Sequence, residues 1–338
     1  MKEIILKILP YYFNFNRIFS YNYCSTFILI GGRGIGKTTG ACIKVAKNYI
    51  KKDEQFVYVR RYKNEIKKSK TIFSKILLNV KTKGIGSGGF EYIYKGGVFG
   101  WAIPLSTAIS FKSGINFDRV STIIFDEAIL PRKSPYKYLP DEIHAFFELV
   151  STITRTRKNY KIIIIGNNAD IFNIYFDYFK VPTFDGIYVD KERGLYCELS
   201  KINPDLLKVE QETPLYKLVN GTPYGEYHYN NKPLTSDEYN IDVKINTDEL
   251  LIRLIYNNYT LNVYRHNNYK LFIEFKDKAI KDNISFILYE GNNPNYYYIG
   301  LFRKSSIYKR ITYAYYNNAV SYDSQKCGEI FKIIMEEI

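Results

Sequence analysis

Strand-length apolar runs alternate with segments of helical spacing along the first 200 residues. The apolar runs lie at residues 23–30, 54–61, 121–125 and 161–165. The segments with helical spacing lie at 38–52, 65–81 and 141–152. Residues 90–94 and 98–102 alternate around a Lys-Gly-Gly turn and predict a hairpin. Irregular segments are expected at 1–20, 84–89 and 131–140. Strands that alternate with helices are typical of a mostly parallel sheet with helices on both faces, so we expect an α/β fold.

The rest of the chain has a different pattern. Residues 201–245 are rich in Pro, Asn, Gly and Thr and predict a linker or a loosely packed subdomain. Alternating segments follow within 249–290, and residues 326–338 have the spacing of a closing helix. We therefore predict three parts: an α/β domain over 1–200, a linker over 201–245, and a smaller β-rich α+β domain over 246–338.

Length and composition fit a globular protein of two domains. The chain has 338 residues, of which 46% are hydrophobic, and this excludes a disordered chain. Its four cysteines form no C-x-x-C pair and no zinc spacing with the three histidines, which indicates a reducing compartment. No apolar stretch reaches the ~18 residues of a membrane-spanning helix, and no signal peptide is apparent. We expect a soluble, intracellular protein with no membrane partner.

Positive charge is concentrated in the first part of the chain. Residues 1–200 hold 31 Lys or Arg and 17 Asp or Glu, whereas residues 201–338 hold 17 of each, so the net charge of +14 lies in the first part. Between Lys44 and Lys83 there are 13 basic and 3 acidic residues. Such a field attracts polyanions, and nucleic acid is the usual partner. The alternative is a solvated face of a lysine-rich protein.

A phosphate-binding loop is predicted between the first strand and the first long helix, where the chain reads GGRGIGKT. In such a loop the glycines let backbone N–H groups surround the phosphates, the lysine reaches the β- and γ-phosphates, and the threonine hydroxyl binds Mg²⁺. The motif therefore predicts ATP and Mg²⁺ as cofactors. The residues expected to bind the nucleotide are Gly31, Gly32, Arg33, Gly34, Ile35, Gly36, Lys37, Thr38 and Thr39.

Two adjacent carboxylates, Asp126 and Glu127, end the apolar strand at 121–125. Asp126 is placed to hold Mg²⁺, and Glu127, pointing the other way, is placed to act as general base toward the attacking water. The 89-residue separation of Lys37 and Asp126 leaves room for the strand at 54–61 between the two motifs. An inserted strand and a Glu beside the Mg²⁺ aspartate indicate the additional-strand, catalytic-glutamate (ASCE) class of ATPases. The alternative is a solvated strand end.

Three further polar residues are candidates for supporting roles. Asn167 ends the next apolar strand, where its amide could sense the γ-phosphate or close a turn. Arg155 and Arg157 lie just before that strand. Ring ATPases commonly take an arginine from a neighbouring subunit to stabilise transition-state charge, although on spacing alone each arginine also fits a solvated position.

Six segments occur together in the order found in one family: GGRGIGKT, EQFVYVRRYKNE, GGVFGWAIPLS, VSTIIFDEAI, TRTRKNYKIIIIGNN and NGTPYGEY. They resemble the DNA-packaging ATPases of phi29-like small podophages, which are terminase-like. The resemblance implies a motor that hydrolyses ATP to drive double-stranded DNA into a preformed procapsid. It also implies further partners, namely the portal (or connector), a packaging RNA and other copies of the chain in a pentameric ring. The implied location is the host cytoplasm, with transient docking on the procapsid.

The resemblance also implies residue roles. Arg155 matches the family's trans-acting arginine. Lys63 and Lys112 match basic positions at the subunit interface or in DNA contact, two roles that the sequence does not separate. The loop at 84–89 and the hairpin after it are expected to face the pore. The residues that keep the roles given above are Lys37, Thr38, Asp126 and Glu127.

For the last part of the chain, the resemblance implies an RNase H-like domain that has lost nuclease activity. A metal-dependent nuclease of that fold needs a carboxylate within its first strand. The predicted first strand, residues 251–256, contains none. The pairs Arg303-Lys304 and Lys309-Arg310 could contact nucleic acid or lie on an ordinary solvated helix face. We expect a nucleic-acid-binding and coupling module.

Two other functions use the same residues. A nucleotide-switched, nucleic-acid-binding regulator would turn over slowly, and the general base predicted at Glu127 disfavours it. A terminase-like packaging enzyme with residual nuclease activity would also cut DNA, and the carboxylate-poor first strand disfavours that function.

Overall fold

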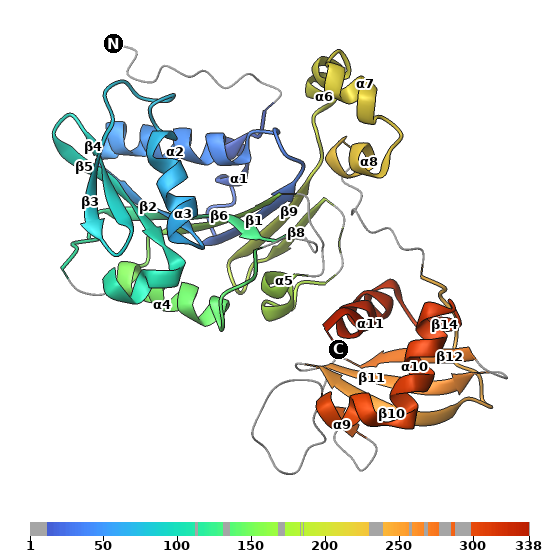
Figure 1. The fold of residues 1–338 in the computed structure, drawn as a ribbon. Coiled ribbons are helices and arrows are strands. Elements are labelled where there is room, and N and C mark those ends of the chain that lie inside the picture. Colours follow the sequence, from blue (N-terminus) through green and yellow to red (C-terminus); the bar gives the residue numbers. More distant parts are fainter. Residues whose placement is uncertain are drawn as a thin grey trace. The chain divides into compact units, whose positions relative to one another are not determined.

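The computed structural model contains two compact units, Met1–Thr235 and Ser236–Ile338 (Figure 1). No helix among the residues that the structure describes is long and apolar enough to cross a membrane. The described residues are 12–111, 114–130, 136–167, 173–182, 184, 186–229, 239–256, 259–266, 270–276, 285–287 and 299–337.

A nine-stranded sheet forms the centre of the first unit. Its strands are β1 (Thr26–Gly31), β2 (Gln55–Arg60), β3 (Lys81–Gly86), β4 (Gly89–Tyr94), β5 (Gly97–Pro104), β6 (Val120–Ile129), β7 (Lys161–Asn167), β8 (Ile187–Asp190) and β9 (Leu195–Ser200). The order across the sheet is β3-β4-β5-β2-β6-β7-β1-β9-β8. All pairings from β5 to β9 are parallel, and only β3, β4 and β8 at the two edges pair antiparallel. The prediction of an α/β fold with a mostly parallel sheet is confirmed.

Helices cover both faces of this sheet (Figure 1). One face carries α1 (Phe15–Ile18), α2 (Lys37–Lys52) and α3 (Lys63–Lys68), and the other carries α4 (Glu142–Thr154) and α5 (Ile174–Tyr178). Alternate residues of β1 serve the two faces: Phe27 and Leu29 join the core beneath α2, and Ile28 and Ile30 join the core beneath α4. Since successive strand side chains point to opposite faces, a strand covered on both sides needs a continuous apolar run.

The strand inserted between the two nucleotide motifs differs from the one expected. In space β7 separates β1 from β6, whereas β2, the strand predicted at 54–61, lies on the far side of β6. The ASCE-type arrangement is therefore present, but the inserted strand follows the carboxylates in the chain instead of preceding them. The order of strands in a parallel sheet is set by crossover connections and packing, which chain order does not reveal.

Two local predictions between residues 65 and 89 were wrong. The helix expected over 65–81 ends early, because α3 stops at Lys68 and only a 3₁₀ turn follows at Ser69–Thr71. The Ser69 hydroxyl donates to the Ile66 carbonyl at 2.7 Å, and such side-chain bonds compete with helix continuation. Half of the loop expected at 84–89 is the end of the edge strand β3, which pairs with β4 through an irregularity at Gly84–Gly86; only a two-residue turn separates the two strands.

Three short helices occupy much of the predicted linker at 201–245. They are α6 (Pro204–Gln211), α7 (Pro214–Val219) and α8 (Pro223–Tyr229). Asn203 and Thr213 cap the first two, each just before a proline at the first helical position. Proline is favoured there because its missing N–H would have no helical partner. The Pro-rich composition thus marks helix starts as well as turns.

The second unit contains a five-stranded mixed sheet. Its strands are β10 (Glu249–Tyr256), β11 (Tyr259–His266), β12 (Lys270–Lys276), β13 (Ser285–Ile287) and β14 (Val320–Tyr322), in the order β13-β10-β11-β12-β14. Helices α9 (Ile299–Lys304), α10 (Ser306–Tyr316) and α11 (Gln325–Glu337) pack on its apolar face. The β-rich pattern and the closing helix are confirmed.

The first strand of the second unit starts earlier than expected. β10 begins at Glu249, so it does contain a carboxylate, contrary to the prediction for residues 251–256. That carboxylate lies at the exposed end of the strand, 3.1 Å from Arg265. Among the residues that the structure describes, no group of three or more His, Cys, Asp or Glu side chains could hold a metal ion.

Candidate nucleotide site

The predicted phosphate-binding loop joins β1 directly to α2. Gly34 and Gly36 have φ angles of +82° and +92°, which glycine adopts without steric cost, and Gly36 is the residue that precedes the first turn of α2. The loop therefore places the free N–H groups of a helix start at the carboxyl end of a parallel strand. This is the arrangement that binds phosphate.

Lys37 lies folded back over the loop. Its ammonium group donates to the carbonyl oxygens of Gly31 and Gly32, both at 2.8 Å, and its side chain is only 4% exposed. Burial lowers the pKa of Lys37 to about 7, although the nearby charge of Asp126 works in the opposite direction. A phosphate chain would supply the negative charge that this lysine lacks.

Asp126 accepts hydrogen bonds from three side chains of the site, those of Thr38, Tyr58 and Arg60. Thr38 donates its hydroxyl to one carboxylate oxygen at 2.8 Å, and Tyr58 donates its hydroxyl to the other at 2.6 Å. The carboxylate is buried, with 2% of the side chain exposed. Thr38 and Asp126 thus bring a hydroxyl and a carboxylate together, which are the oxygen ligands that Mg²⁺ prefers, so these residues fit the ion.

Glu127 does not point away from Asp126 as expected. Its φ angle of +53° interrupts the alternation of the strand and turns the side chain toward the face that carries Asp126. The carboxylate is 48% exposed and forms an ion pair with Arg60. The two adjacent carboxylates therefore converge on one side of the sheet.

Arg60, the last residue of β2, connects both carboxylates and was not among the predicted site residues. It donates to Asp126 at 2.7 Å and to the Tyr58 hydroxyl at 3.1 Å, and it pairs with Glu127. Burial is the largest single influence on Arg60 and lowers its pKa, but Asp126, Tyr58 and Glu127 together outweigh burial and leave the pKa raised. Its position at the end of a strand expected beside the carboxylates was the signal that could have found it.

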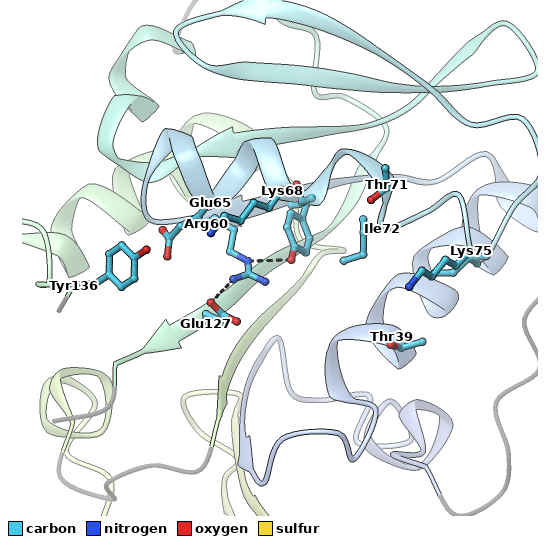
Figure 2. Close-up of a pocket in the computed structure, with 12 residues that line it drawn as sticks. Thr39, Arg60, Glu65, Lys68, Thr71, Ile72, Lys75, Glu127 and Tyr136 are labelled. Carbon is cyan, nitrogen blue, oxygen red and sulfur yellow. Dashed lines mark hydrogen bonds and ion pairs between the residues drawn. The ribbon is translucent and has the colours of Figure 1, made fainter. Parts of the chain in front are cut away.

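A cavity of about 480 Å³ opens beside this group (Figure 2). Thr39, Arg60 and Glu127 line it from the strand and helix ends, and Lys68, Thr71 and Lys75 line it from α3 and the segment that follows. The general-base candidate and the residue after Thr38 thus face one cavity.

Asn167 lies next to the phosphate-binding loop. It is the last residue of β7, and the parallel register sets it opposite Gly31, where the loop begins. The structure therefore brings this predicted residue to the loop.

Arg155 and Arg157 lie at the end of α4 in different environments. Arg157 donates to the carbonyls of Asp118 at 2.9 Å, Val120 at 2.5 Å, Ile153 at 2.5 Å and Thr154 at 3.3 Å. Arg155 is exposed and follows α4 with a φ angle of +49°, and within the described part of the chain its side chain makes no hydrogen bond or ion pair. The guanidinium of Arg157 is therefore occupied by carbonyls of its own chain, whereas that of Arg155 is exposed to solvent.

Of the two predicted lysines, Lys63 and Lys112, the structure describes only Lys63. Lys63 is the exposed first residue of α3 and packs its aliphatic chain against the turn at Gly88, between β3 and β4. Lys112 lies outside the described residues.

Comparisons with known proteins agree over nearly the whole chain. The family model described as Podovirus DNA encapsidation protein (Gp16) matches residues 8–337. The DNA packaging protein of Bacillus phage phi29 is 30% identical over 319 residues, which cover 93% of this chain and 94% of that protein. The corresponding protein of Bacillus phage B103 is 29% identical over 311 residues, or 90% of this chain and 94% of that one.

Solved structures agree with the sequence relatives. A chain of the bacteriophage phi29 viral genome packaging motor assembly superimposes with a TM-score of 0.70 at 27% identity, covering 96% of this chain and 99% of that chain. The phi28 gp11 DNA packaging motor shares the fold with a TM-score of 0.58 at 15% identity, over 93% of this chain and 94% of that chain.

Proposed function

This chain belongs to the Podovirus DNA encapsidation protein (Gp16) family, and from that premise we propose how its first unit hydrolyses ATP. The protein is an ATP-driven DNA packaging protein of the phi29 type. One observation supports the residue roles best: Thr38 and Asp126 meet at 2.8 Å beside Lys37 and Glu127, at the carboxyl ends of β1 and β6, the two parallel strands that flank β7. Nucleotides bind at this edge of α/β sheets.

ATP binding would replace the hydrogen bonds that the loop now makes within itself. The phosphate chain takes over Lys37 from the carbonyls of Gly31 and Gly32, and the N–H groups at the start of α2 face the phosphates. Thr38 and Asp126 would hold Mg²⁺, which screens the phosphate charge and favours attack on phosphorus. Asn167, opposite Gly31, is placed to contact the γ-phosphate.

Hydrolysis needs Glu127 to be free of Arg60. The water that attacks the γ-phosphorus gives a proton to Glu127 while the bond to the leaving ADP oxygen breaks. In the described structure Arg60 forms an ion pair with Glu127, and this pair would have to open before Glu127 accepts the proton. This observation also favours the alternative function, a nucleotide switch that turns over slowly, and the rate with DNA separates the two.

Arg155 is the residue we assign to the neighbouring subunit's site. It is exposed and without a partner in the described residues, whereas Arg157 is engaged with four carbonyls. An arginine supplied in trans stabilises transition-state charge and requires a closed assembly, for which we propose a pentameric ring. Lys63 and Lys112 are assigned to the same subunit interface or to DNA.

The remaining partners follow from the packaging role. We assign the motor to residues 1–200, the connection to 201–245, and nucleic-acid binding and coupling without cleavage to 246–338. Double-stranded DNA would be held through its phosphates by the basic residues between Lys44 and Lys83, which accepts any sequence. The ring would dock on the portal of a procapsid in the host cytoplasm, with a packaging RNA as a further partner.

Steady-state ATP turnover with and without double-stranded DNA tests the assignment. We expect DNA to raise turnover in the wild type, and Glu127→Gln to keep nucleotide binding but lose turnover at least a hundred-fold, since proton transfer contributes about 10²–10⁴ to a rate. Glu212→Gln, at the exposed residue that follows α6, is the matched control. Normal turnover by Glu127→Gln would remove the general base from this site, and a low rate unaffected by DNA would favour the switch.

A further inference from the structure

The backbone at Glu127 is held in a conformation that its own strand does not supply. β6 pairs with β7 up to Phe125 opposite Ile164, and pairing resumes only at Ile129 opposite Gly166. On the other side, the register with β2 ends at Phe125. Residues 126–128 therefore bulge out of both ladders, and Glu127 adopts a φ of +53°, which is uncommon for a residue other than glycine.

This conformation decides where the general base points. Regular alternation would place Glu127 on the face of Phe125, beneath α4, away from Asp126. The left-handed turn brings its carboxylate to the nucleotide face, where it meets Arg60. Something outside the strand must hold this turn, because a left-handed backbone costs energy that only surrounding contacts can offset.

Arg61 supplies that contact from the opposite face of the sheet. Its guanidinium donates to the carbonyl of Ala128 at 2.6 Å and to that of Glu127 at 3.4 Å. Both carbonyls belong to the bulge that lies outside the ladders. The side chain is 1% exposed and lies over the rings of Tyr138 at 5.0 Å and Phe125 at 5.8 Å, so it has little freedom to leave.

Glu142, the first residue of α4, fixes Arg61 in turn. It accepts two parallel hydrogen bonds from the guanidinium, at 2.5 and 2.9 Å, and its own side chain is 1% exposed. Tyr175 donates its hydroxyl to Glu142 at 2.7 Å, and the Leu139 N–H donates to it at 3.0 Å. The pair is thus anchored to α4 and α5 and is satisfied without any nucleotide.

We propose that Arg61, oriented by Glu142, is a positioning residue that holds the Glu127–Ala128 backbone so that Glu127 faces the nucleotide. The inference rests on the proposed role of Glu127 as general base. A buried ion pair adds little net stability over an apolar pair of similar size, so stability alone does not account for Arg61 and Glu142. The hydrogen bonds from Arg61 to the two carbonyls of the bulge do account for the pair.

The test is a double-mutant cycle on ATP turnover by the full chain in the presence of double-stranded DNA. Arg61→Lys keeps the charge but cannot reach Glu142 and both carbonyls together. We expect kcat to fall about ten- to a hundred-fold with the dissociation constant of a fluorescent ATP analogue changed less than two-fold. In the Glu127→Gln background, Arg61→Lys should lower residual turnover no further, because Arg61 acts only through Glu127. Arg17→Lys, which alters the paired arginine of Glu198, is the matched control.

The result that overturns the inference is a wild-type kcat for Arg61→Lys, or loss in the Glu127→Gln background by the same factor as in the wild type. If Arg61→Lys does not fold, Arg61→Met combined with Glu142→Gln removes both charges, while the amide oxygen can still accept from the Leu139 N–H and the amide NH2 can donate to the Tyr175 hydroxyl. The same loss of kcat is expected. Failure of the proposed function has a different signature, since Glu127→Gln alone would then turn over normally.

Discussion

Arg60 is the last residue of β2 and Arg61 follows it, yet the two side chains reach the end of β6 from opposite faces of the sheet. Arg60 binds the side chains of Asp126 and Glu127, beside an open cavity. Arg61 binds the backbone of Glu127 and Ala128 and is closed in by Glu142. The partners of Arg60 are the groups that a nucleotide and its metal need, whereas the partners of Arg61 are a buried carboxylate and the backbone that orients Glu127. A bound nucleotide or ion can therefore replace Arg60 as the partner of the two carboxylates, whereas Arg61 stays paired with Glu142.

The largest effect is expected from removing the buried acid. Glu142→Ala leaves Arg61 charged, buried and unpaired, and we expect the free energy of unfolding to fall by about 3–5 kcal/mol. Arg60→Ala should cost less, because Thr38 and Tyr58 still donate to Asp126 and Lys37 remains nearby. Denaturant unfolding of the full chain with and without Mg·ADP measures both.

Adding Mg·ADP should affect the stability of these two variants differently. The deficit of Arg60→Ala relative to the wild type should shrink when Mg·ADP is added, because the ion can take the place of the lost charge. The deficit of Glu142→Ala should stay the same. If Mg·ADP reduced the stability deficits of both variants equally, the proposed difference between Arg60 and Arg61 would be contradicted.

A smaller effect is expected at the end of α4, where two arginines again differ in their partners. Arg157→Ala removes hydrogen bonds to four carbonyls and should lower stability by about 1–2 kcal/mol. Arg155→Ala should change stability by less than about 0.5 kcal/mol, as is usual for exposed positions, but should remove turnover in the assembled ring. Thermal unfolding and ATP turnover measure the two effects separately.

Mixed assemblies identify the subunit that supplies the arginine. Arg155→Ala subunits should regain turnover when mixed with Glu127→Gln subunits, which keep Arg155. If turnover is absent at every mixing ratio, Arg155 does not act in trans.

The smallest effect concerns pH and the unliganded Lys37. Its pKa is about 7 in the unliganded site, and phosphate binding restores the charged form. Above pH 7 binding must therefore take up a proton, and nucleotide affinity should fall by up to about ten-fold per pH unit toward the lysine's ordinary pKa. Calorimetry at pH 8.5 in two buffers of different ionisation enthalpy measures the proton taken up. Lys37→Met should bind more weakly and take up none, and equal uptake by this variant would assign the proton to another group.

Much of the site could be predicted because its parts are local. The loop from Gly31 to Thr38 needs only a strand, a run of glycines and a helix start, which are contiguous in the chain. Asp126 likewise follows from a buried strand that ends in a carboxylate. The early end of α3 and the extension of β3 through its glycines could not be predicted, because side-chain bonds and strand pairing outweighed the local pattern.

The sequence by itself determined the α/β class of the first unit, the phosphate-binding loop and the pair of carboxylates, since each depends on residues close together in the chain. Only the tertiary structure decided which strand separates β1 from β6, and that Glu127 turns toward Asp126. It also decided the different roles of Arg60 and Arg61, which are identical in residue type and adjacent in sequence. The pleat sends neighbouring side chains to opposite faces, and what each one binds depends on elements that pack there from distant parts of the chain.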